Sequence, residues 1–176
     1  MLFADITRFT QRAAGQPPQQ LLRFLDALFS RFDALADRHG VEKIKTIGDA
    51  YMVASGVPGA RADQADALAH MALDMMAVAR ELSSADADLN LRIGIASGPL
   101  VAGVMGKKRQ IYDLWGDTVN LASRLESHGI EGEIQVDAAT YRLLKPRFTL
   151  VTRGQVAIKG KGLLTTYLLK SARRAA

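Results

Sequence analysis

The sequence contains no cysteine. This absence excludes disulfide bonds, a thiol nucleophile and any cysteine-ligated zinc site, and it agrees with a reducing compartment. No apolar run approaches the roughly 20 residues that a transmembrane helix needs, and the first residues lack the pattern of a signal peptide. We therefore expect a cytoplasmic catalytic or binding domain without membrane contact of its own, with any membrane anchor lying outside this chain.

Aromatic residues are also scarce, and neither sign of charge is in large excess. Aromatic residues make up 6% of the 176 residues, and the formal net charge is +5. No block of five or six like charges occurs, whereas nucleic-acid-binding surfaces usually carry dense basic patches and stacking aromatics. A small positive surplus suits a phosphate-rich small ligand equally well. We expect no nucleic-acid partner.

The composition that remains is that of an ordinary globular protein, with 48% hydrophobic and 23% charged residues. The length allows a sizeable core without disulfide bonds. No linker, internal repeat or low-complexity segment divides the chain. We predict one domain over residues 1–170, followed by a basic, disordered tail at 171–176.

Hydrophobic periodicity predicts the order strand, helix, strand, strand, helix, strand in the first part of the chain. Apolar residues recur at helical spacing after Pro17-Pro18 and stop at His39-Gly40. Two of the apolar runs flank Gly48-Asp49, a turn of hairpin type. The expected bounds are strands at 1–6, 41–47, 51–55, 91–96 and 100–105, a helix after Pro18 and a helix at 62–82.

The strands at 91–96 and 100–105 are expected to pair around Ser97-Gly98-Pro99. Further elements follow in the same reading: a helix at 118–127, a strand at 134–136, a short helix at 138–144, and two or three strands within 148–169. This order is the split βαβ pattern. It predicts an α+β fold with a ferredoxin-like βαββαβ core, a mainly antiparallel sheet and C-terminal strand additions.

Asp5 and Asp49 stand out among the acidic residues by position. Asp5 lies in an apolar strand, where a carboxylate is costly, and Asp49 lies in the hairpin turn. Taken alone, Asp49 fits ordinary turn chemistry, and Asp5 fits a carboxylate that caps the next helix. If their strands are neighbours, both carboxylates meet at one edge of the sheet. Such a pair, with no histidine nearby, favours hard cations such as Mg²⁺ or Mn²⁺ and can hold two of them about 4 Å apart.

A second set of polar residues suits a nucleotide. Asn120 and Arg124 are four apart in a predicted helix, so both project from one face toward a nucleotide oxygen and a reacting phosphate. Lys45 and Asp113 could form a donor–acceptor pair for a base edge, and Lys159 could reach a terminal phosphate. Each feature also has a plain structural interpretation: a solvated helix face, an ordinary salt bridge and a basic turn between strands.

Five segments together resemble the catalytic domain of class III adenylyl and guanylyl cyclases. They follow one another at compatible spacings from the first residues to about Leu169, almost the whole chain. The segments are LFADITRFT, EKIKTIGDAYM, LRIGIASGPLVAGVMG, YDLWGDTVNLASRLES and VAIKGKGLLTTYLL. The resemblance implies the fold of the class III cyclase homology domain and a phosphorus–oxygen lyase that forms a cyclic nucleotide.

The resemblance also implies how the metal and the triphosphate are held. Asp5 and Asp49 match the two aspartates that bind two divalent metal ions, Mg²⁺ or Mn²⁺, and Ile6 matches the position that lends a backbone carbonyl. The segment from Thr7 through Phe9 to Thr10 matches the turn whose backbone N–H groups hold the triphosphate before a helix N-terminus.

For the base and the reaction, the resemblance implies an adenylyl cyclase that converts ATP to 3′,5′-cyclic AMP and pyrophosphate. Lys45 and Asp113 match the pair that reads adenine N1 and N6, where guanylyl cyclases of the family usually have Glu and Cys or a similar small residue. Asn120 and Arg124 match the residues that orient the ribose and stabilise the transition state. Lys159 matches the lysine on the terminal phosphates.

The resemblance further implies a homodimer, because each active site of the family is shared by two chains. One chain gives Asp5 and Asp49, and the other gives the base-reading pair with Asn120, Arg124 and Lys159. Two alternatives stay open at this point: a guanylyl cyclase, and a non-catalytic module that binds a nucleotide or mediates dimerisation.

Overall fold

The computed structural model describes residues 1–83, 89–108 and 110–173 of the chain. A seven-stranded sheet forms its centre, with strand order β2-β3-β1-β4-β7-β9-β8. All neighbouring strands in it run antiparallel except β4 and β7, which are parallel. The predicted α+β fold with a mainly antiparallel sheet is therefore confirmed.

The first part of the chain forms the predicted βαββαβ core. Its longer helices begin and end where the sequence signals lie: α2 has Pro18 in its first turn, and Gly40 ends it in the left-handed region with φ 60°. The elements are β1 (Leu2–Ile6), α1 (Phe9–Ala14), α2 (Pro18–His39), β2 (Glu42–Ile47), β3 (Ala50–Ala54), α3 (Gln64–Leu82) and β4 (Leu91–Ile95).

The second part adds a separate hairpin, a helix and further strands. These are β5 (Val101–Met105), β6 (Ile111–Trp115), α4 (Asp117–Ser127), β7 (Ile134–Val136), α5 (Ala138–Leu144), β8 (Phe148–Ile158) and β9 (Gly162–Ala172). β9 continues to Ala172, so the segment expected to be a tail begins inside a strand, and residues 174–176 lie outside the described residues. Within the described residues, no helix has both the length and the apolar character needed to cross a bilayer.

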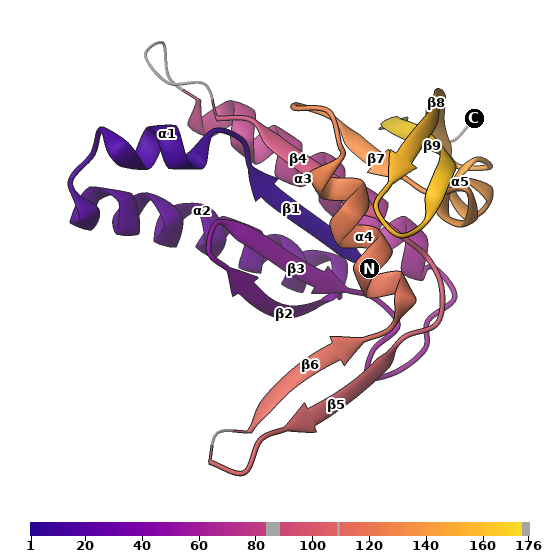
Figure 1. The fold of residues 1–176 in the computed structure, drawn as a ribbon, viewed down its shortest axis with the longest axis horizontal. Helices are drawn as coiled ribbons and strands as arrows, with labels where there is room; N and C mark the ends of the chain where they lie inside the picture. The colour runs from indigo at the N-terminus through magenta and orange to yellow at the C-terminus, as the bar shows by residue number, and fades with distance from the viewer. Residues whose placement is uncertain (84–88, 109, 174–176) are drawn as a thin grey trace.

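One predicted strand pairing is wrong. β4 does not pair with β5, because both of its edges are taken, one by β1 and the other by β7. β5 instead pairs with β6, a strand that the sequence reading did not predict, and the two form a two-stranded sheet that projects away from the central one (Figure 1). The Ser97-Gly98-Pro99 segment is therefore a connection between two sheets and not a hairpin turn.

Helices cover both faces of the central sheet (Figure 1). α2 and α3 pack on one face, where Leu2, Ala4 and Ile6 of β1 join the main core. α4 packs on the other face, where Phe3 lies in a smaller cluster with Ala122 and Leu125. Because side chains alternate along a strand, Asp5 lies on the same face as Phe3, the face that α4 covers.

Gly94 lets α4 approach the sheet closely. A Cβ atom at this position of β4 would lie 2.2 Å from the backbone nitrogen of Glu126 and 2.5 Å from the carbonyl oxygen of Ala122. Any side chain there would push α4 off the strand. The helix is thus fixed at short distance above β4, which positions the residues on both sides of it.

Candidate active site

Asp5 and Asp49 come together because β1 and β3 are neighbours. The antiparallel register places Asp5 opposite Ala50, the residue that follows Asp49. Both side chains are partly buried, and they lie close enough for a hydrogen bond between the two carboxyl groups. Burial, together with the negative charges of Glu126 and Asp49, raises the pKa of Asp5 to about 6. The juxtaposition that the sequence suggested is present.

This arrangement fits a divalent cation. Burial, and next the neighbouring carboxylates Glu126 and Asp49, raise the pKa of Asp5, and a cation bound beside it would stabilise the ionised form. In the described part of the chain, no cluster of three or more His, Cys, Asp or Glu side chains is arranged to hold a metal. The chain therefore offers a cation two carboxylates and leaves its other positions to backbone, water or phosphate oxygens, as Mg²⁺ sites commonly do.

We predict that Asp5→Asn stabilises the metal-free protein. The folded-state pKa of Asp5, about 6, lies above the ordinary value of 3.8, so ionising this carboxyl opposes folding. Stability contributed by its protonated form is present below about pH 4 and is lost as the pH rises through 6. At pH 7.5 the variant should exceed the wild type by about 3 kcal/mol in unfolding free energy.

Urea denaturation in EDTA, at intervals between pH 4 and pH 8, measures this difference. The two proteins should be nearly equal in stability near pH 4 and diverge as the pH rises. Parallel stability curves over the whole range would show that Asp5 titrates normally. In a parallel series without EDTA, added Mn²⁺ should stabilise the wild type more than the variant, because the variant lacks one carboxylate.

The turn after β1 is fixed by contacts to neighbouring loops. The backbone N–H of Thr7 donates to the carbonyl of Asn90 at 3.0 Å, and its hydroxyl donates to Glu131 at 3.0 Å. Thr7 thus holds the turn in place. Its backbone N–H, which was expected to face a phosphate, donates to a carbonyl of the chain in this structure. Arg8 has φ 57°, a left-handed conformation that is uncommon outside glycine. Phe9 and Thr10 then begin α1, where first-turn amides lack an intrahelical acceptor.

Lys45 and Asp113 form an ion pair between β2 and β6. The Lys45 Nζ lies 2.5 Å from Asp113 Oδ2, and the other carboxylate oxygen of Asp113 accepts from the Leu114 amide at 2.9 Å. Although burial works in the opposite direction, these hydrogen bonds lower the pKa of Asp113. Asp113 is thus an ionised acceptor beside a cationic donor, both partly open to solvent.

Asn120 and Arg124 lie on α4, and the turn between β8 and β9 reaches the same helix. Arg124 lies against Gly160 of this turn, where a Cβ atom would be 2.8 Å from its Nη1. Lys159, next to Gly160, is exposed. Lys161 pairs with Asp117 at the start of α4 and so fastens the turn to the helix. The fold therefore gathers Arg124 and Lys159, which are far apart in the sequence, at one place.

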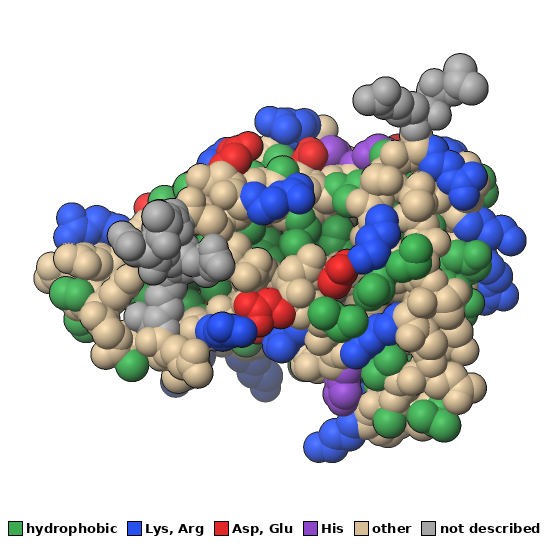
Figure 2. Space-filling view, turned by 90° about the horizontal axis from the view of Figure 1, so that it is seen from above, with side chains coloured by type: hydrophobic (Ala, Val, Ile, Leu, Met, Phe, Trp, Pro, Cys, Tyr) green, Lys and Arg blue, Asp and Glu red, His purple; other side chains and the backbone are tan. Residues whose placement is uncertain are grey.

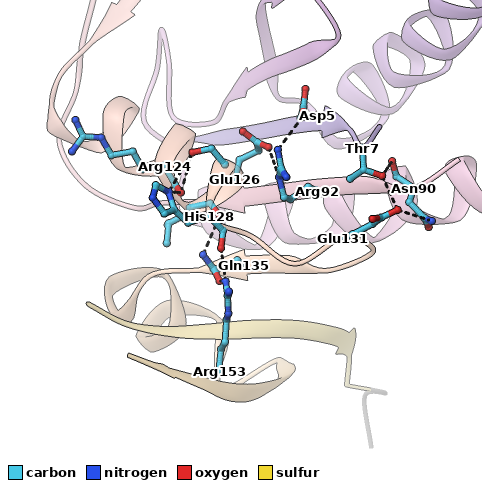
Figure 3. A network of polar contacts seen from close by, with 12 residues as sticks. Asp5, Thr7, Asn90, Arg92, Arg124, Glu126, His128, Glu131, Gln135 and Arg153 are labelled. Atoms are coloured by element: carbon cyan, nitrogen blue, oxygen red, sulfur yellow. Dashed lines mark hydrogen bonds and ion pairs between the residues drawn. The ribbon is translucent and has the colours of Figure 1, made fainter. Parts of the chain in front are cut away.

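The carboxylates of Asp5 and Asp49 do not face Arg124 within one chain. Glu126 of α4 contacts Arg92, which in turn contacts Asp5, so the Glu126 side of the helix faces the carboxylate pair. Residues two apart on an α-helix point about 200° from one another. Figure 3 shows the result: the Arg124 side chain points away from Asp5 and Arg92.

Arg92 and Glu126 are residues near the site that the sequence reading missed. Arg92 lies directly opposite Asp5 in the β1–β4 register. A charged residue inside an apolar strand, Leu91-Arg92-Ile93, was the available signal, and it is the same kind of signal that singled out Asp5. Glu126 is buried, and burial raises its pKa against the opposing effect of Arg92.

Comparison with known proteins identifies the family. The family described as "Adenylate and Guanylate cyclase catalytic domain" matches residues 1–171. The chain belongs to this cyclase family. The resemblance found in the five segments is thereby confirmed.

Relatives of this cyclase domain act on different nucleotides according to their names. The chain is 52% identical over 170 residues to an "Adenylate cyclase" of Mycobacterium tuberculosis, covering 96% of this chain and 38% of that protein. It is 42% identical over 172 residues to "Guanylate cyclase soluble subunit beta-2" of Rattus norvegicus, covering 96% of this chain and 25% of that protein. The cyclase domain thus spans less than half of these relatives.

A solved structure agrees with the fold of the cyclase domain. The guanylate cyclase domain of RhGC from Catenaria anguillulae, in complex with GTP, superimposes with a TM-score of 0.93 at 37% identity. The match covers 98% of this chain and 95% of that one. The fold of this chain is therefore the fold of a solved cyclase domain.

The charged surface of the cyclase domain is mixed. On the face shown in Figure 2, Lys and Arg side chains lie in small groups, with acidic and apolar side chains between them. Among the described residues on this face, positive charge does not form the continuous stripe typical of a nucleic-acid groove.

Proposed function

We propose that this chain is the catalytic domain of an adenylyl cyclase, which converts ATP to 3′,5′-cyclic AMP and pyrophosphate. The observation that carries the choice of ATP is the ion pair between Lys45 and Asp113, with 2.5 Å between Nζ and Oδ2. With Lys45 donating to adenine N1 and Asp113 accepting from the N6 amino group, both hydrogen bonds of the base edge are made.

The same placement disfavours guanine. Guanine carries an acceptor at position 6 and an N–H donor at position 1, so it would face a carboxylate with an oxygen and an ammonium with a hydrogen. Unpaired polar groups in a partly desolvated site cost much more than a missing apolar contact. Because hydrogen bonds lower the pKa of Asp113, it stays ionised and keeps its acceptor character at neutral pH.

The reaction needs few groups from the protein. The ribose 3′-hydroxyl gives its proton to solvent and its oxygen bonds to the α-phosphorus, while the bond from that phosphorus to the bridging oxygen breaks and pyrophosphate leaves with the electron pair. Divalent cations held by Asp5 and Asp49 would lower the pKa of the 3′-hydroxyl and neutralise phosphate charge. Asn120 orients the ribose, and Arg124 stabilises the charge that develops on the α-phosphate. Lys159 holds the terminal phosphates, and the turn that leads through Phe9 and Thr10 into α1 supports them.

The complete site is proposed to form between two copies of the chain. The Asp5 carboxylate lies on one side of α4, and the Arg124 side chain points away from it on another side. One copy therefore supplies the carboxylates, and the other supplies Asn120 and Arg124. Exposed apolar side chains on the β5–β6 hairpin and the β2–β3 turn offer a surface that a second copy would bury. These residues are Val101, Val104, Met105, Ile111, Trp115 and Ile47.

A cyclic-nucleotide assay tests this function. Purified protein is incubated with Mn²⁺ and either ATP or GTP at several protein concentrations. We expect cyclic AMP as the main product, with activity per milligram rising as dimers form. A guanylyl cyclase, favoured by the similarity to the GTP-bound domain, would give mainly cyclic GMP. If a dimeric sample forms neither cyclic AMP nor cyclic GMP, the chain is a non-catalytic module.

Base selection can be tested separately by Lys45→Glu combined with Asp113→Cys. The double variant replaces the adenine-reading pair with the residues usual in guanylyl cyclases. The ratio of kcat/KM for ATP to that for GTP should fall by about 100-fold or more. The matched control is Lys43→Glu, because Lys43 lies on the same strand but pairs with Asp33. An unchanged preference for ATP in the double variant would refute the base-reading role.

A further inference from the structure

The C-terminal end of α4 is held by side chains from two strands of the central sheet. Gln135 of β7, which is fully buried, donates from Nε2 to the Leu125 carbonyl at 3.0 Å. Arg153 of β8 donates from Nη1 to the His128 carbonyl at 2.6 Å and also to the side-chain oxygen of Gln135 (Figure 3). Carbonyl groups at the end of a helix have no partner within the helix, so these side chains supply two of the missing donors.

Arg153 is aimed at α4 by an irregularity in β8. The β8–β9 register shifts between Thr152 and Gly154, which leaves Arg153 as an extra residue outside the register. Gly154 has φ 103°, in the left-handed region that favours glycine. A bulge of this kind bends a strand and redirects a side chain, and bulges are common beside active sites. The bulge thus directs Arg153 toward the helix.

The β8–β9 hairpin contacts α4 a second time, at the start of the helix. Lys161, in the turn that follows β8, pairs with Asp117 in the first turn of α4. Gly160 of the same turn lies against the Arg124 side chain, where a Cβ atom would be 2.8 Å from Nη1. The hairpin and the helix are therefore joined at two places, and Arg124 lies between them along α4.

Arg124 is bonded directly to the end of the helix that Arg153 holds. The Arg124 carbonyl accepts from the backbone N–H of His128 at 3.0 Å, and from Nδ1 of the His128 ring at 2.9 Å. Arg153 binds the carbonyl of that same residue. His128 thus links the backbone of Arg124 to β8. Because a misplacement of about 1 Å can lower a reaction rate about 100-fold, the location of this helix end matters for any chemistry that uses Arg124.

We propose that Arg153 is a positioning residue for Arg124. By holding the end of α4 against β8, it keeps Arg124 at a fixed distance from Lys159 in the turn that follows β8. This inference rests on the proposed function, because it takes Arg124 and Lys159 as groups that act on the substrate. It assigns Arg153 to the half of the shared site that contains Arg124, and it requires no contact between Arg153 and the nucleotide.

Arg61 offers a matched control, because it holds the end of a different helix in the same way. Its Nη1 donates to the carbonyls of His39 at 2.9 Å and Gly40 at 2.6 Å, at the C-terminal end of α2. None of the residues proposed for the reaction lies on α2. If Arg153 only fastened a helix, its loss and the loss of Arg61 would have the same result, which is lower stability with unchanged kcat.

Steady-state kinetics of the full chain with ATP and Mn²⁺ give the first test. Arg153→Met should lower kcat about 10- to 100-fold, whereas Arg61→Met should keep kcat within about 2-fold of the wild type. Thermal unfolding and gel filtration verify that each variant is folded and dimeric. Gly154→Ala, which strains the bulge and leaves Arg153 in the sequence, should lower kcat in the same direction. It replaces Arg153→Met in every test if that protein does not fold.

Mixed dimers then locate the effect in one half of the shared site. Arg153→Met protein is mixed in equal amounts with Asp49→Ala protein or with Arg124→Ala protein. The mixture with Asp49→Ala should show about a quarter of wild-type activity, because each mixed dimer has one intact site. The mixture with Arg124→Ala should be about 5- to 50-fold less active, because every site then lacks either Arg124 or Arg153.

Equal recovery in the two mixtures would overturn the proposal, since the substitution would then affect the chain as a whole. A wild-type kcat in Arg153→Met dimers would overturn it as well. Failure of the proposed function gives a different result. In that case the reference mixture of Asp49→Ala with Arg124→Ala would stay inactive although mixed dimers form, and the role of Arg153 would be lost with the shared site.

Discussion

Asp49→Ala is expected to lower cyclic-nucleotide formation by at least about 1,000-fold while the protein stays folded. Asp49 supplies one of the two carboxylates proposed to hold the cations, and its loss would leave phosphate charge uncompensated in the transition state. Burial and the neighbouring negative charges of Glu126 and Asp49 raise the pKa of Asp5 to about 6, so they disfavour the ionised form of Asp5. Removing one carboxylate should therefore leave stability equal or slightly higher.

The measurement is initial-rate product formation with saturating ATP and Mn²⁺, together with thermal unfolding. Glu42→Ala is the matched control, because Glu42 is an exposed carboxylate at the start of β2, the strand that precedes Asp49. It should keep the activity of the wild type. If the Asp49→Ala protein keeps more than about a tenth of wild-type activity, Asp49 does not take part in the reaction.

Much of the fold was predictable because the buried side of a helix or strand requires apolar residues at regular spacing in the sequence. The helix ending at His39-Gly40 and the strand that follows Gly48-Asp49 contribute buried residues to the main core, so their apolar residues repeat with clear periods. The β5–β6 hairpin was mispredicted because it lies outside that core. Val101 and Val104 are exposed, so apolar residues there do not report on the central sheet.

The candidate site was predictable where a motif is continuous in the sequence, and less so where it depends on packing. Asp5 and Asp49 were paired by assuming neighbouring strands, and the β1–β3 register bears this out. The link from Asp5 through Arg92 to Glu126 could not be foreseen. Its members are 87 and 34 residues apart, and they meet only because α4 is held directly above β4.

Arg124→Ala is the second change with a large expected effect. Removing a donor that stabilises transition-state charge typically lowers kcat about 100- to 1,000-fold. KM for ATP should change much less, because the charge in question develops during the reaction. Arg124 is partly exposed against the turn at Gly160, so the variant should fold normally. A loss of affinity for ATP with unchanged kcat would instead indicate a binding role.

The matched control for Arg124→Ala is Arg142→Ala. Arg142 lies on α5 and is exposed, and it donates only to the Ala138 carbonyl of its own helix among the contacts described. Its substitution removes the same charge at a place remote from the proposed site. Both kcat and KM should be those of the wild type.

The central claim is that the carboxylates of one copy act with Arg124 of another. Mixing purified Asp49→Ala and Arg124→Ala proteins tests it most directly, because each is inactive alone and each retains the half that the other lacks. With free exchange at equal amounts, half of the dimers are mixed and each has one intact site, so about a quarter of wild-type activity should return. If mixed dimers form and no activity returns, the active site is not shared between two copies.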